Sequence, residues 1–67
     1  MNFGKALQEQ RKLARLSQSQ LAKETGIKQQ TLSRWENNMH IPDIENCIIL
    51  AKYYGITLEE LLDVDLP

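Results

Sequence analysis

The apolar residues of this chain recur at helical spacing from end to end, and no segment alternates as a half-buried strand would. The spacing predicts five short helices: about residues 2–14, 17–26, 28–37 and 43–55, and a last one that begins after Thr57. Residues 64–67 are expected to fray. Residues 1–67 are therefore predicted to form a single domain of the all-α class, a compact five-helix bundle.

Start and stop signals support these boundaries. Ser17 with Gln20, and Thr57 with Glu60, have the spacing of a capping box, and Gly26 suits a left-handed helix end. The predicted inward faces are Phe3, Ala6, Leu7, Leu13 and Ala14; Leu21 and Ala22; Ile27, Leu32 and Trp35; and Ile44, Cys47, Ile48, Ala51 and Tyr54.

Charge is unevenly distributed along the chain, although the net charge is only −1. Residues 1–35 hold seven basic and two acidic side chains, whereas residues 36–67 hold one basic and seven acidic ones. This asymmetry suggests an anionic partner for the first half, but two solvated faces explain it equally well. A single cysteine, Cys47, allows no internal disulfide and favours a reducing, cytoplasmic compartment.

Residues 17–37 have the spacing of a helix-turn-helix unit, with small Ala22 at the helix crossing and Gly26 in the turn. Together with the segments LSQSQLAKETGI, TLSRWEN and LAKYYGITLEELL and with Pro42, this unit resembles the Cro/repressor-type helix-turn-helix domains of phage and bacterial regulators. The resemblance covers about residues 3–63 and implies the lambda-repressor-like fold. It also implies a cytoplasmic transcriptional regulator, expected to be a repressor, that binds double-stranded operator DNA as a homodimer.

The predicted third helix places Gln30 and Arg34 on the face opposite its Leu32–Trp35 stripe. A glutamine amide matches the adenine edge, and a guanidinium matches the two guanine acceptors. By resemblance, Gln29, Gln30 and Arg34 read bases, with Ser33 and Lys28 as further candidates. The alternative is that these are ordinary solvated helix residues.

Phosphate contacts are expected at both ends of this unit. Gln18 opens the second helix, whose free N–H groups and dipole favour an anion. The resemblance implies phosphate contacts for Gln18 and for the loop residues Asn37 and Asn38. Thr31 and His40 are further candidates, although a lone histidine in a loop is more often simply solvated.

Arg11 and Glu36 are charges on otherwise apolar helix faces, so a mutual ion pair is the economical arrangement. The family carries a partly buried pair at matching positions, which implies that it orients the third helix. Three residues depart from the family pattern: Lys28 replaces a capping serine or threonine, Asn38 replaces a loop glycine, and Cys47 replaces a core leucine.

An enzyme is not expected, because the chain has one histidine, no apparent nucleophile–base arrangement, no glycine-rich phosphate loop and no metal-ligand cluster. No cofactor is expected either. The serious alternative is a protein–protein module such as an antitoxin or adaptor, which would use Ile49, Leu58 and Leu62. The candidate homodimer residues are Leu58, Leu62 and Val64, and core packing accounts for most of them equally well.

Overall fold

The computed structural model describes residues 2–64 and contains five helices and no strand within that range. They are α1 (Phe3–Leu13), α2 (Gln18–Thr25), α3 (Gln29–Glu36), α4 (Ile44–Tyr54) and α5 (Leu58–Leu62). The all-α, five-helix prediction is therefore confirmed. Of the tail expected to fray, residues 65–67 lie outside the described part of the chain. No helix among residues 2–64 is long and apolar enough to cross a membrane.

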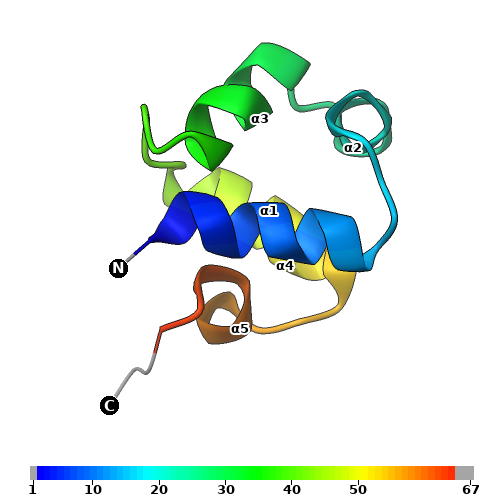
Figure 1. The fold of residues 1–67 in the computed structure, drawn as a ribbon. Coiled ribbons are helices and arrows are strands. Elements are labelled where there is room, and N and C mark those ends of the chain that lie inside the picture. Colours follow the sequence, from blue (N-terminus) through cyan, green and yellow to red (C-terminus); the bar gives the residue numbers. More distant parts are fainter. Residues whose placement is uncertain (1, 65–67) are drawn as a thin grey trace.

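The helices surround one core. In Figure 1, α1 runs across the centre, α2 and α3 lie above it, α5 lies below it and α4 lies behind. The closest packing is between α1 and α3, between α2 and α3, and between α5 and both α1 and α4. The buried core cluster comprises Leu7, Leu21, Ile27, Leu32, Trp35, Cys47, Leu50, Ala51 and Leu61. Every helix thus contributes at least one side chain to the same apolar interior.

Two of the predicted inward faces are partly wrong. Leu13 is 77% exposed and Ala14 is also exposed, because α1 ends there and the chain turns away at Arg15, which has φ 60. Ile44 and Ile48 are 62% and 40% exposed. On α4, the predicted Cys47 and Ala51 are buried and Tyr54 is half-buried, but the residue that completes this stripe is Leu50. So many residues of α4 are apolar that several stripes share the helical period, and spacing alone does not select one.

The helix ends follow the predicted chemistry. Both capping boxes are present, Ser17 with Gln20 and Thr57 with Glu60. Gly26 has φ 78, as a left-handed helix end requires. At the end of α3 the left-handed residue is Asn38, with φ 59. The N–H groups of Asn38 and Met39 close that end by donating to the carbonyls of Trp35 and Arg34.

Candidate nucleic-acid interface

The turn between α2 and α3 is short and internally bonded. The Thr25 hydroxyl donates to the Leu21 carbonyl at 2.8 Å and accepts from the Ile27 N–H at 3.2 Å. On the buried side of α3, Leu32 is 2% exposed and Trp35 is 4% exposed. Because both apolar anchors of α3 are buried, its opposite face is fixed towards solvent.

That outer face carries the residues expected to read bases. Lys28, Gln29, Gln30 and Arg34 are exposed, whereas Ser33 is half-buried. Lys28 has the extended backbone of an N-cap, but its side chain makes no cap hydrogen bond. The backbone N–H groups in the first turn of α3 therefore receive no hydrogen bond from the Lys28 side chain. They lie beside the exposed amides of Gln29 and Gln30.

Two other predicted residues, Thr31 and His40, lie with Arg34 around a shallow hollow between α3 and α4. The hollow has a volume of about 320 Å³. Its lining comprises Thr31, Arg34, Trp35, His40, Ile41, Asp43 and Asn46. Thr31 and His40 thus flank Arg34, as residues at the edge of one contact surface would.

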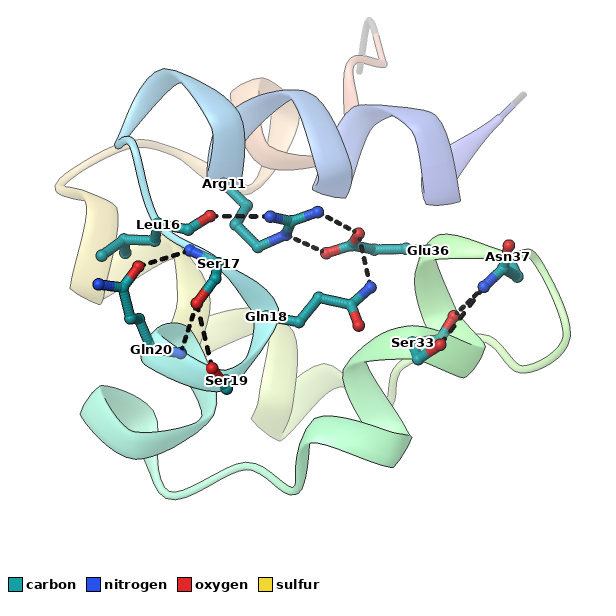
Figure 2. A network of polar contacts seen from close by, with 9 residues as sticks. All are labelled: Arg11, Leu16, Ser17, Gln18, Ser19, Gln20, Ser33, Glu36 and Asn37. Atoms are coloured by element: carbon teal, nitrogen blue, oxygen red, sulfur yellow. Dashed lines mark hydrogen bonds and ion pairs between the residues drawn. The ribbon is translucent and has the colours of Figure 1, made fainter.

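The ion pair expected between Arg11 and Glu36 is present and is bidentate (Figure 2). Arg11 Nε and Nη2 donate to Glu36 Oε2 and Oε1 at 2.8 and 2.9 Å, and Nη1 donates to the Leu16 carbonyl at 2.8 Å. The two side chains are 11% and 4% exposed. The hydrogen bond with Glu36 raises the pKa of the Arg11 guanidinium above its ordinary value. One guanidinium therefore joins α1, the turn after it and the last turn of α3.

Gln18 joins the same network, which the sequence did not indicate. Its Nε2 donates to Glu36 Oε1 at 3.1 Å, so this oxygen accepts from both Gln18 and Arg11 (Figure 2). Since Gln18 opens α2 and Glu36 closes α3, the bond links the expected phosphate end of one helix to the far end of the other. Spacing within either helix carries no signal of this contact.

The loop after α3 is tied to the start of α1. Asn38 Oδ1 accepts from the Gly4 N–H at 3.0 Å, and Asn38 Nδ2 donates to Asn2 Oδ1 at 2.9 Å. An added Cβ at Gly4 would lie 2.6 Å from the Glu36 carbonyl oxygen. Sequence reasoning missed this approach, although a glycine in the first turn of a helix is a signal for one. The Asn37 amide donates to the Ser33 carbonyl at 2.8 Å. Both asparagine side chains thus already have partners within the chain.

Tyr54 lies beside the ion pair. Its hydroxyl is buried and has no hydrogen-bond partner within residues 2–64. Burial, with a further contribution from the negative charge of Glu36, raises the pKa of Tyr54 to about 12. The phenol therefore stays neutral at physiological pH and adds no charge to the Arg11–Glu36 pair.

The geometry is that of a helix-turn-helix unit, and the chain matches the model of a helix-turn-helix family over residues 7–61. The chain belongs to this family, the Cro/C1-type helix-turn-helix group of DNA-binding regulators. It is 32% identical over 62 residues to the HTH-type transcriptional activator BcrR of Enterococcus faecalis. That match covers 92% of this chain and 30% of the relative, so the chain spans less than a third of that protein's length. No solved structure matches the chain significantly.

Proposed function

We propose that the chain binds a specific operator in double-stranded DNA and reads it in the major groove with α3. The observation that supports this most directly is the exposure of Gln29, Gln30 and Arg34 on a helix whose Leu32 and Trp35 are buried beneath. A recognition helix docks with its N-terminal residues towards base edges. Each bidentate pairing of an amide with adenine, or of a guanidinium with guanine, contributes about 1–3 kcal/mol of discrimination.

Phosphate contacts would hold this helix in register without reading sequence. Gln18 stands at the start of α2, and Thr31 and His40 line the hollow beside Arg34. Lys28, a further base-reading candidate by resemblance, is proposed here to contact phosphate, because its side chain makes no cap hydrogen bond. Asn37 and Asn38 are secondary candidates for phosphate contacts, since their side-chain amides already donate hydrogen bonds within the chain. Ser33 is a secondary candidate, because it is half-buried and its carbonyl accepts from Asn37.

The proposed assembly is a homodimer bound to a two-fold symmetric operator. The proposed location of the protein is the cytoplasm. Half-sites of such operators lie roughly 34–36 Å apart, and the domain measures 34 × 25 × 21 Å. Two copies bound to adjacent half-sites would therefore touch if the long dimension of each domain lies along the line between the half-sites. Leu58, Leu62 and Val64 remain the candidate contact residues, and all three are half-buried.

We propose repression as the regulatory outcome, because a small domain that occupies an operator excludes polymerase without any further contact. The relative from Enterococcus faecalis is named as an activator. A reporter gene with the operator overlapping its promoter separates the two. Lower output with the protein present supports repression, and higher output favours activation.

The test of DNA reading is selection of bound duplexes from a random pool, followed by affinity measurement on the selected and on a scrambled duplex. Gln30→Ala should relax the preference at one base pair per half-site, whereas Gln10→Ala on α1 is the matched control. Affinity for both duplexes should fall steeply as salt rises, because neutralised phosphates release counterions. Recovery of no sequence preference by the wild-type chain would refute the proposal.

A protein–protein module remains the second candidate, and one observation favours it. Several large apolar side chains are exposed around the start of α4, among them Ile41 at 78% and Ile44 at 62%. Exposed apolar clusters often mark binding surfaces. An adaptor would not need the side chains of Gln29, Gln30 and Arg34. If alanine variants of these three residues still bind every partner of the wild-type chain, that result would favour the adaptor function over DNA reading.

A further inference from the structure

One side of α4 carries large apolar side chains in solvent. Ile44 is 62% exposed, Ile49 is 42% exposed, and Ile48 and Tyr53 are each 40% exposed. The opposite side of the helix enters the core and packs against α5 and α2. Exposed apolar clusters of this kind mark interaction surfaces. We call the solvent side the outer face of α4; its exposed residues are Ile44, Glu45, Ile48, Ile49, Lys52 and Tyr53.

The two charges on this face are placed symmetrically about its centre. Glu45 stands three positions before Ile48, and Lys52 stands three positions after Ile49. Because seven residues make about two helical turns, Glu45 and Lys52 project in nearly the same direction from α4. Neither side chain forms an ion pair within residues 2–64. The outer face of α4 therefore has two central isoleucines with an acid on one side of them along the helix and a base on the other.

We propose that the outer face of α4 binds the same face of a second copy of the chain. The two α4 helices would run antiparallel, with a two-fold axis between Ile48 and Ile49. Glu45 of each copy then faces Lys52 of the other, and the four isoleucines meet around the axis. The inference rests on the proposed function only for its homodimer, and it requires no DNA. It gives that dimer a surface on α4 in place of one on α5.

Charge complementarity is the reason for choosing a second copy and an antiparallel orientation. Two parallel α4 helices would bring Glu45 against Glu45 and Lys52 against Lys52, and like charges across an interface oppose binding. The antiparallel pair converts both contacts into attractions. On α5, by contrast, Leu58 and Leu62 already pack against the core cluster. The outer face of α4 thus offers more free apolar surface than the α5 residues do.

The contact would be weak in solution and stronger on DNA. An 11-residue helix is about 16 Å long, so the buried area lies at the low end for specific interfaces. We expect a dimer with a Kd of roughly 10–100 μM without DNA. Two copies held at neighbouring half-sites have an effective concentration in about the millimolar range. The same contact would therefore be largely formed on an operator.

Charge reversal tests the pairing directly. Sedimentation velocity without DNA, over a series of concentrations, gives the Kd of wild type, Glu45→Lys and Lys52→Glu. Each single variant should self-associate at least about tenfold more weakly than wild type, because like charges then face each other at both ends of the contact. An equimolar mixture of the two variants should recover the wild-type Kd to within about threefold, since the basic face of one then meets the acidic face of the other.

The matched control is Glu59→Lys, which reverses an exposed acid at the second position of α5, as Glu45→Lys does on α4. Its Kd should equal that of wild type. A loss of association in Glu59→Lys but not in Glu45→Lys would place the contact on α5 and overturn the proposal. A mixture of Glu45→Lys and Lys52→Glu that stays monomeric while each variant is folded by circular dichroism would also overturn it.

Wild type alone provides a second measurement that does not depend on the variants. Amide NMR shifts of residues 44–53 should change as the protein concentration rises through the Kd, while those of α1 stay constant. A wild-type chain that remains monomeric up to about 1 mM would overturn the proposal. Failure of the proposed function would show differently, as an absence of sequence preference in the duplex selection, and it would leave the self-association of the free chain unchanged.

Discussion

Replacing Arg11 by methionine is the sharpest test of what holds α3 in place. The variant keeps an unbranched side chain in the same space but removes three hydrogen bonds, two to Glu36 and one to the Leu16 carbonyl. It leaves the Glu36 carboxylate with a side chain only 4% exposed and with Gln18 as its remaining donor. Removing one partner of a buried ion pair costs about 3–5 kcal/mol, mainly because the other charge stays buried without compensation.

That cost is large for a chain of this length. At roughly 0.05–0.15 kcal/mol per residue, a 67-residue domain has a free energy of unfolding of only about 3–10 kcal/mol. In domains of this size each kcal/mol shifts the melting temperature by roughly 4–8 °C. Arg11→Met is therefore expected to melt at least about 12 °C below wild type. Far-UV circular dichroism during heating measures the melting temperature, and the same signal during urea titration at 25 °C measures the free energy of unfolding.

The double variant Arg11→Met with Glu36→Leu is the control. Replacing a buried pair by apolar groups of similar size is often neutral or stabilising. The double variant should therefore be more stable than Arg11→Met alone, although it carries an additional substitution. The reasoning is refuted if Arg11→Met costs less than about 1 kcal/mol, or if the two single losses simply add in the double variant.

Three further substitutions test separate features of the fold. Gly4→Ala should lower the melting temperature, because the added methyl would meet the Glu36 carbonyl at 2.6 Å, and such crowding costs about 1–3 kcal/mol against a helix-propensity gain of about 0.5–1. Lys28→Ser should stabilise the domain by about 1 kcal/mol in urea titration by supplying the missing cap of α3, and it should reduce the salt dependence of DNA binding by about one phosphate contact. Tyr54→Phe should have a melting temperature at neutral pH equal to or above that of wild type, since the lost hydroxyl has no hydrogen-bond partner within residues 2–64. The folded-state pKa of Tyr54 is raised from 10 to about 12, so the unfolded chain loses the phenol proton at a lower pH than the folded protein. The stability of wild type relative to Tyr54→Phe is therefore constant below pH 10 and falls as pH rises from 10 to 12. Melting temperatures measured over that interval should favour Tyr54→Phe increasingly.

Local chemistry in the sequence predicted the helices well. Ser17, Gln20, Thr57 and Glu60 form their capping boxes as expected, because such bonds close within one helical turn. The same holds for Gly26, whose φ of 78 follows from the absence of a Cβ. The capping boxes depend on residues three positions apart and the helix end depends on one glycine, and a single sequence displays both directly.

The choice of buried face was harder to predict where a helix is apolar on several sides. On α4, the stripe through Ile44 and Ile48 and the stripe through Leu50 have equivalent spacing, and only the neighbouring helices select between them. The contacts of Gly4 and Gln18 with residues more than a dozen positions away depend on how helices meet. Arg11 and Glu36 were the exception, because two opposite charges on apolar faces each require a partner.

That exception explains why the interface could be anticipated only in outline. Charges on apolar faces predicted that α1 and α3 would be joined, and the exposed side of α3 then followed from its buried side. The third member of the network, Gln18, is an ordinary polar residue on a partly exposed position, so nothing local requires it to bond inward. Yet its bond to Glu36 is the one that connects the proposed phosphate contact with the proposed base contacts. The placement of α3 against α2 therefore depends on a tertiary contact, whereas the identity of the side chains on the exposed face of α3 depends on local sequence. Substitutions in the two sets should accordingly differ: changes at Gln30 or Arg34 should alter which bases are preferred, whereas changes at Gln18 should weaken binding to all sequences alike.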